Sequence, residues 1–284
     1  MKKIGFIDYY LSEWHANNYP AWIKEACGRL GIEEYTVAYA WGELELSPKY
    51  GETSAEWCAK YGAELCSSIE ELCEKSDVIM ILAPSDPEKH LEYATRALAY
   101  GKRTYIDKTF APDLATAREI VALSQRYGAP MFSTSALRYA DELALAGNCR
   151  QVMVTGGGGN LPEYLIHQAE MVVKKMGLGA ETVRAEQIGG ITRLTVGYSD
   201  GRIAEMNYAP KLAFSIYMDE GGESKPVHKP VTSEFFAHLM EDIVRFYDTG
   251  AVSFDVAETL EVAALRETGL LAVSRMGETV PMVR

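Results

Sequence analysis

Two side chains stand at positions from which they could move a proton. Lys108 comes directly after the stretch 103–106, where we expect a buried strand to end. Burial disfavours the charged form of a lysine and so lets it exchange a proton near neutral pH. His167 lies in a predicted helix, one turn after Glu163 and beside Tyr164, and imidazole suits proton transfer at neutral pH. The structural alternatives are a surface lysine that begins a loop and a buried, hydrogen-bonded histidine.

Strands and helices alternate through the first half of the chain, and this order must position Lys108. We predict strands at 3–7, 35–40, 77–83, 103–106 and 130–133, separated by helices at 20–30, 54–61, 68–75, 90–100 and 113–127. Such an order is typical of right-handed βαβ units in a doubly wound, Rossmann-like parallel sheet. Ligands of these sheets bind beyond the carboxyl ends of the strands, so we expect 8–15, 83–90 and 107–110 to form one rim.

The second half of the chain predicts a different domain. We expect strands at 151–155, 193–198, 203–208 and 211–219 and helices at 162–176, 235–247 and 256–274. Asp200-Gly201 is a strong hairpin signal, and Gly156–Gly159 form either an anion nest or a tightly turned loop. The fold class is therefore α/β, with a Rossmann-like dinucleotide-binding-type domain at 1–135 and an α+β substrate and oligomerisation domain at 136–284. A largely antiparallel sheet with one open face predicts a homodimer or homotetramer.

Composition excludes several classes of protein. The 284 residues are 48% apolar and 24% charged, which is ordinary for a globular chain and excludes disorder, collagen and coiled coil. A net charge of −12 predicts no affinity for nucleic acid or for anionic membranes. The apolar block 78–83 has the length of a strand, far short of a membrane span. Five cysteines without a C-x-x-C pair predict reduced thiols, a cytoplasmic location and no metal site.

Several ordered stretches resemble the Gfo/Idh/MocA oxidoreductase family, which includes glucose–fructose oxidoreductase and inositol dehydrogenase. Ile81-Leu82-Ala83-Pro84 followed by His90 is similar to the family's A-T-P…H series. Asp107-Lys108-Thr109 stands where the family has E-K-P. Glu163-x-x-x-His167 is similar to its D-x-x-x-H, with Glu in place of Asp. The segment 246–250 and the helix after it complete the series, so the resemblance covers nearly the whole chain.

The resemblance implies an NAD(P)-dependent dehydrogenase whose substrate is a sugar, a cyclitol or a related polyol. It makes Lys108 and His167 the catalytic proton carriers, with Glu163 beside the histidine and Asp107 tuning the lysine. It also implies that the nicotinamide end of NAD or NADP contacts the rim through Ala83, Pro84, Ser85, His90, Asp107 and Lys108. Two alternatives stay open: a cofactor-free member of the fold that binds a carbohydrate-like ligand, and a lyase or hydrolase that keeps a tightly held cofactor.

The loop after the first strand departs from the family. A dinucleotide fold places G-x-G-x-x-G there so that the backbone can approach the pyrophosphate, but this chain has Asp8-Tyr9-Tyr10-Leu11-Ser12-Glu13. Asp8 and Glu13 are anionic where the pyrophosphate dianion would bind. The second strand ends without the acid that usually binds the ribose, unless Glu43 or Glu45 takes that role. We expect weak or shifted dinucleotide binding, better retained at the nicotinamide end. The candidate contacts in this loop are Asp8, Tyr9, Tyr10 and Ser12.

Three further residues are candidate substrate contacts. His15 follows the loop among aromatic and amide side chains, a mixture that suits a sugar but equally fits an exposed helix start. Arg138 follows the first domain and binds either a substrate or Asp141 or Glu142. Tyr164 lies on the predicted helix of the histidine.

Overall fold

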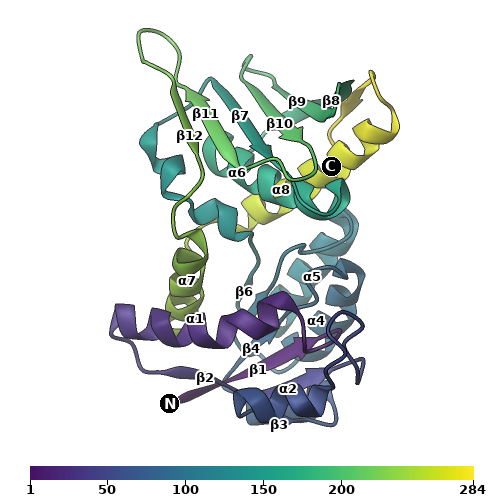
Figure 1. The fold of residues 1–284 in the computed structure, drawn as a ribbon, viewed down its shortest axis with the longest axis vertical. Helices are drawn as coiled ribbons and strands as arrows, with labels where there is room; N and C mark the ends of the chain where they lie inside the picture. The colour runs from purple at the N-terminus through teal and green to yellow at the C-terminus, as the bar shows by residue number, and fades with distance from the viewer. The chain divides into compact units, whose positions relative to one another are not determined.

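The chain folds into two compact units, which a computed structural model describes over residues 1–284 (Figure 1). Unit 1 comprises Met1–Ala111, Ala115–Thr134 and Leu239–Phe254, and unit 2 comprises Pro112–Leu114, Ser135–His238 and Asp255–Arg284. The change of unit after Thr134 lies where the sequence predicts a boundary. The division differs from the predicted domains in that Leu239–Phe254 belongs to unit 1 rather than to the domain 136–284.

Unit 1 is built on a six-stranded parallel sheet, as its alternating pattern predicts. Its strands are β1 (Lys2–Asp8), β2 (Tyr35–Gly42), β3 (Glu64–Leu65), β4 (Val78–Ile81), β5 (Thr104–Ile106) and β6 (Met131–Phe132). They lie in the order β3-β2-β1-β4-β5-β6, and every pair is parallel. This is the strand order of Rossmann folds, so the predicted fold class is confirmed and the carboxyl ends of the strands meet at one rim.

Three helices of unit 1 begin at capping side chains, those of Glu13, Thr53 and Ser68. They are α1 (Trp14–Leu30), α2 (Ser54–Tyr61), α3 (Ile69–Lys75), α4 (His90–Leu98) and α5 (Leu114–Tyr127), with a 3-10 turn η1 at Pro87–Lys89. Helix α1 packs on β2, α3 on β1 and β2, and α4 on β4 and β5. Helix α1 begins well before its predicted start at Pro20, because the side chain of Glu13 caps it.

Helix α7 (Phe235–Thr249) joins unit 1 from Leu239 onward. Its buried Tyr247 donates a hydrogen bond to the carbonyl of Ile79 on β4 at 2.8 Å. Arg103 donates to the last carbonyls of this helix, those of Tyr247 at 2.5 Å and Asp248 at 2.8 Å, where a cation is stabilising. The sequence pattern does not indicate this, because an apolar helix face fits either sheet equally well.

Unit 2 is built on a seven-stranded, mostly antiparallel sheet. Its strands are β7 (Gln151–Gly156), β8 (Ala180–Ile188), β9 (Ile191–Tyr198), β10 (Ile203–Tyr208), β11 (Ser215–Asp219), β12 (Val227–Pro230) and β13 (Thr279–Pro281). Their order is β12-β11-β7-β10-β9-β8-β13, and β7 with β10 is the one parallel pair. The sequence pattern does not predict β8, β12 or β13, because β12 and β13 are short and β8 carries charged residues.

Two long helices and two 3-10 turns complete unit 2. They are α6 (Leu161–Met176), α8 (Val256–Ser274), η2 (Ala136–Tyr139) and η3 (Asp141–Leu145). Helix α6 packs on β7, β10 and α8, while α8 packs on β8, β9 and β13. The bounds of α8 are those that the sequence predicts, since Asp255 supplies a cap at its start.

The glycines that end β7 are in close contact with other parts of unit 2. A Cβ atom on Gly157 would lie 1.7 Å from the carbonyl oxygen of Ala209, and one on Gly158 would lie 2.0 Å from the ring of Tyr164. A side chain at position 157 would require the backbone to move, and one at position 158 would displace the ring of Tyr164. Close packing therefore accounts for these glycines without an anion.

No helix is both long enough and apolar enough to cross a membrane. No group of three or more His, Cys, Asp or Glu side chains is placed to hold a metal ion. All five cysteines are unpaired and buried.

Candidate active site

The rim of the unit 1 sheet gathers candidate residues around Asp107, which directly follows β5. The buried carboxylate of Asp107 accepts hydrogen bonds from the hydroxyls of Tyr105 (3.2 Å) and Tyr19 (3.4 Å) and from the amide of Lys108 (2.9 Å). It also pairs with Nδ1 of His15. Burial opposes the ionisation of Asp107, but His15 and Lys108 outweigh it and lower the pKa below its ordinary value. Asp107 is therefore a fixed negative charge at neutral pH.

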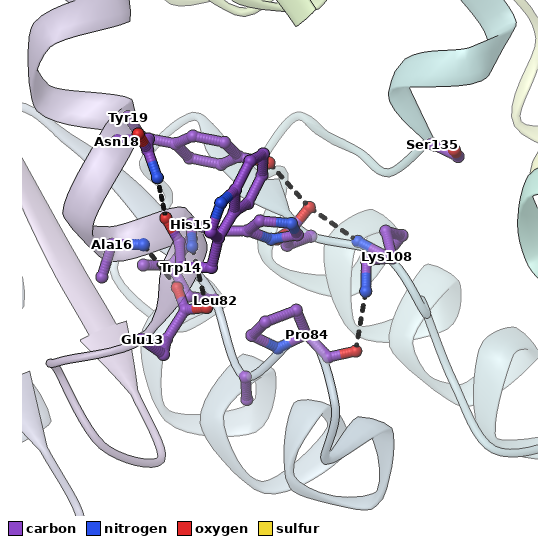
Figure 2. Close-up of polar contacts among 12 residues, drawn as sticks. Glu13, Trp14, His15, Ala16, Asn18, Tyr19, Leu82, Pro84, Lys108 and Ser135 are labelled. Carbon is purple, nitrogen blue, oxygen red and sulfur yellow. Dashed lines mark hydrogen bonds and ion pairs between the residues drawn. The ribbon is translucent and has the colours of Figure 1, made fainter. Parts of the chain in front are cut away.

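His15 lies inside this cluster rather than at an exposed helix start. Its ring stacks on Tyr19, with the centroids 5.0 Å apart and the planes 8° from parallel, and it is only 7% exposed. Trp14 lies edge-on to it at 5.1 Å and is 41% exposed (Figure 2). His15 is therefore a buried partner of Asp107, and its role as a substrate contact stays a prediction.

Lys108 is held in place rather than free on the surface. Its side chain is 8% exposed, and Nζ donates a hydrogen bond to the carbonyl of Pro84 at 3.2 Å (Figure 2). This bond links the end of β5 to the loop after β4. The amine thus lies at the rim where ligands of such sheets bind.

The loop after β4 is held by backbone contacts. The ring of His90 is fully buried, with Nδ1 3.0 Å from the carbonyl of Phe110 and Nε2 beside that of Leu82. Burial lowers its pKa below the ordinary value of a histidine. His90 therefore ties two rim segments together and positions them, in contrast to the direct cofactor contact that we expect from the sequence. Ala83 is buried and donates its amide to Asp8 at 3.0 Å, whereas Ser85 is exposed.

The loop after β1 does not fit a pyrophosphate. The first amides of α1, those of His15 (2.8 Å) and Ala16, donate to the carboxylate of Glu13. The hydroxyl of Ser12 donates to Glu52 at 2.6 Å. Two amides at the start of α1 and the hydroxyl of Ser12 are thus bonded to carboxylates of the chain itself.

The end of β2 carries an acid that the sequence pattern places in a loop. The strand runs to Gly42, two residues beyond its predicted end, so Glu43 directly follows it. Dinucleotide folds place the acid that binds the ribose at this point. Glu43 accepts from Tyr93 at 2.7 Å and pairs with Lys89 at 2.6 Å; burial opposes its ionisation, but these partners lower its pKa. Of the two possible substitutes, Glu43 is the one that directly follows the strand, and its contact with a ribose stays a prediction.

The two tyrosines of the loop lie near this acid. The rings of Tyr9 and Tyr10 are 6.0 Å apart, and Nζ of Lys89 lies 5.1 Å from the Tyr9 ring. The amide of Leu44 donates to the carbonyl of Tyr9 at 2.8 Å, which anchors the loop against the end of β2. Tyr9 therefore belongs to the loop's own framework.

Asp8 makes the stability of the protein depend on pH. Burial first, and then the charge of Glu13, raise the pKa of Asp8 well above its ordinary value. A folded state that keeps a proton which the unfolded state releases loses stability as the pH rises above about 4. We expect Asp8→Asn to be more stable than the wild type by about 1–2 kcal/mol at pH 8, a difference that shrinks toward pH 4. Denaturant unfolding at a series of pH values measures it, and parallel curves for the two proteins would contradict it.

In unit 2, His167 is hydrogen-bonded to a serine, Ser135, that no sequence motif indicates. Nδ1 of His167 lies 2.6 Å from Oγ of the buried Ser135, and its ring meets those of Tyr164 and Phe214 edge-on at 5.4 and 5.9 Å. The His167 side chain is partly exposed. A serine hydroxyl can donate to or accept from a ring nitrogen, so this bond holds the position of the ring. The one sequence signal for Ser135 is that it closely follows strand β6, near the carboxyl end of that strand.

Arg138 lies in a buried ion-pair network of unit 2. It pairs with Glu170 at 3.0 Å and with Glu258, and only 3% of it is exposed. Neither Asp141 nor Glu142, the partners expected from the sequence, takes part in these pairs. Burial opposes the charge of Arg138, yet the two glutamates raise its pKa, so the guanidinium is charged. Its role as a substrate contact stays a prediction.

Glu163 lies in the first turn of α6, one turn before His167. Its backbone amide donates to the side-chain oxygen Oδ1 of Asn160 at 2.9 Å, which caps the helix. Its carboxylate accepts from the side-chain nitrogen Nδ2 of Asn160 at 3.1 Å. Glu170 accepts from the amide of Ser135 at 3.0 Å, so the Arg138 network supports the serine that binds His167. Helix α6 therefore brings Glu163, Tyr164 and His167 to neighbouring turns, as the sequence predicts.

Comparison with known proteins gives one family and one fold. Residues 46–135 match the model of an oxidoreductase family described as having an NAD-binding Rossmann fold, Gfo/Idh/MocA. The uncharacterized oxidoreductase YhhX of Escherichia coli (strain K12) is 37% identical over 62 residues, which are 22% of this chain and 18% of that protein. The matched family region contains Lys108 and Pro84, whereas the loop after β1 and His167 lie outside it.

Solved structures match the whole chain in fold. A putative myo-inositol dehydrogenase from Sinorhizobium meliloti 1021 has a TM-score of 0.74 at 13% identity, and the match covers 100% of both chains. GenD2 from gentamicin A biosynthesis, solved in complex with NAD, has a TM-score of 0.76 at 12% identity, with 100% of this chain and 97% of that one covered. The family match over residues 46–135 supports the resemblance to the Gfo/Idh/MocA oxidoreductases, and the solved structures show that the whole chain shares their fold.

Proposed function

We propose that this chain is a nicotinamide-dependent dehydrogenase that oxidises a hydroxyl group of a sugar, cyclitol or related polyol. The observation that carries the proposal is Lys108, held on the carbonyl of Pro84 beside the ionised Asp107, within the family region. The names of the fold neighbours, among them a putative myo-inositol dehydrogenase, support the polyol class.

The chain's own residues manage the proton of the reaction. When bound, the nicotinamide ring supplies the hydride acceptor. Lys108 and His167 then take or relay the proton of the substrate hydroxyl, with Asp107 holding the lysine and Ser135 orienting the histidine. Glu163 and Tyr164, on the turn before His167, and His15, on the rim, are proposed contacts of the polyol hydroxyls.

We further propose that NAD is preferred to NADP. An acid directly after β2 accepts the ribose hydroxyls of NAD and repels the additional phosphate of NADP, and Glu43 stands at this position. The parts of the cofactor fit unequally. Glu43 suits the ribose and Lys108 suits the nicotinamide end, whereas the loop after β1 does not suit the pyrophosphate.

A substrate screen tests this function. We expect the wild type to reduce NAD, monitored by absorbance of the reduced nicotinamide, with at least one member of a panel of inositols, hexoses and amino sugars. NADP should give a lower kcat/KM than NAD with the same substrate. Glu43→Ala should reduce this difference in kcat/KM between the two cofactors. A binding measurement must first show that the protein binds the reduced cofactor. If such a protein then turns over no member of the panel with either cofactor, the dehydrogenase proposal is refuted.

We also propose that the protein is cytoplasmic and forms a homodimer or homotetramer. The five unpaired thiols suit a reducing compartment. Along β10 buried residues alternate with partly exposed ones, and Ile191 on the neighbouring β9 is 37% exposed. A second copy of the chain is the partner that this sheet face suits.

A further inference from the structure

The loop between β1 and α1 is the part of unit 1 where the fold and its expected ligand disagree. In Rossmann sheets the amides at the N-terminus of this first helix point at the phosphates of the cofactor, and the helix dipole favours the negative charge. Here the same amides, of His15 and Ala16, donate to the two oxygens of the Glu13 carboxylate. Glu13 is 5% exposed, so the chain itself supplies a buried carboxyl group to the place of the phosphate.

The surroundings of Glu13 add a further acid rather than free donors. Asp8, buried at the end of β1, uses one oxygen to accept from the amides of Tyr9 (2.7 Å) and Ala83 (3.0 Å). Its other oxygen, Oδ2, is buried without any hydrogen-bond partner. Ser12 donates to Glu52, so the hydroxyl of the loop is also taken by a carboxylate. A pyrophosphate placed here would meet two buried acids, and the amides of His15 and Ala16 are already bonded to Glu13.

We propose that Glu13 is a built-in substitute for the cofactor phosphate and that it sets the affinity of this protein for phosphate-bearing ligands. The carboxylate caps α1, which stabilises the helix, and by the same contact it rejects a second anion. A dinucleotide bound by the wild type is then held through its nicotinamide and ribose ends, with its phosphates away from the N-terminus of α1. The identity of the dinucleotide rests on the proposed function, whereas the rejection of phosphate by Glu13 does not.

The variant Glu13→Ser tests this. Serine is itself a good helix cap, so the substitution removes the carboxylate while α1 stays capped. Calorimetric titration with inorganic pyrophosphate should give no binding to the wild type and measurable binding to Glu13→Ser. NADH should bind Glu13→Ser more tightly than the wild type by about tenfold or more, the size of one removed charge contact.

Two matched variants separate the mechanism from simpler causes. Glu71→Ser removes a carboxylate from the first turn of α3 in the same unit, and it should change neither titration. Glu13→Gln removes the charge but leaves a side chain of the same size against the amides, so its gain should be smaller than that of Glu13→Ser. Circular dichroism and thermal unfolding verify that each variant is folded.

The outcomes divide as follows. Equal pyrophosphate affinity in the wild type and Glu13→Ser, or no gain of pyrophosphate and NADH affinity in a folded Glu13→Ser, would overturn the inference. Reduced nicotinamide riboside, which carries no phosphate, should bind both proteins equally. If the riboside and NADH bind neither protein while Glu13→Ser gains pyrophosphate, the role of Glu13 stands for phosphate and the dehydrogenase proposal fails.

Discussion

Replacing Lys108 with methionine should lower kcat for the polyol by about 10²- to 10⁴-fold, the usual contribution of a positioned acid or base. Methionine matches the length of the lysine stem but cannot carry a proton, and it cannot form the hydrogen bond to the carbonyl of Pro84. The measurement is steady-state kinetics with the best polyol of the substrate screen. KM and the affinity for NADH should change far less than kcat.

Lys108→Arg decides between two roles of the amine. Guanidinium keeps the positive charge beside Asp107 but does not release its proton at accessible pH. If proton transfer is the role, Lys108→Arg is nearly as impaired as Lys108→Met; if charge alone matters, it keeps most of the activity. Lys60→Met, which alters a lysine with 53% of its side chain exposed on α2, is the control and should be fully active. Full activity in Lys108→Met would remove this residue from the mechanism.

The largest expected effect on stability comes from Arg138. Replacing it with methionine leaves Glu170, which is 3% exposed, as a buried charge without this partner. Breaking a buried ion pair from one side destabilises a protein by about 3–5 kcal/mol, because the remaining charge stays desolvated. Denaturant unfolding of Arg138→Met should show a loss of this size. The loss should fall when Glu170 is changed to glutamine in the same protein.

A second ion pair of unit 2 provides the comparison. Arg184 pairs with Glu186 at 3.5 Å with 47% of the arginine side chain exposed, and Arg184→Met should cost less than about 1 kcal/mol. Similar losses for Arg138→Met and Arg184→Met would show that the buried network is not a main support of unit 2. If Arg138 instead binds substrate, its replacement would raise KM with little change in the free energy of unfolding.

Much of the fold could be predicted from local pattern. The bounds of α2 and α8 are those expected, because capping residues and apolar spacing act within a few neighbouring residues. Strand β2 extends beyond its expected end because backbone pairing with β1 continues to Gly42. The short strands β12 and β13 exist only through pairing with β11 and β8, so no local signal marks them.

The candidate site was predictable in its positions but less so in its contacts. The ends of β4 and β5 place Pro84, Asp107 and Lys108 at one rim, as the alternating pattern indicates. The pair between His15 and Asp107 joins residues far apart in the chain, and no spacing rule points to it. Likewise, Ser135 became a candidate only through its bond to His167.

The sequence by itself determined the alternation of elements, the parallel first sheet, the mostly antiparallel second one and the side chains that follow each strand. Local rules suffice for these because periodicity, caps and turns act over a few residues. Tertiary structure decided that Glu13 occupies the N-terminus of α1, that Glu43 directly follows β2 and that α7 returns to unit 1. Those outcomes depend on which buried polar groups find partners once distant segments pack, and that balance is absent from any short stretch of chain.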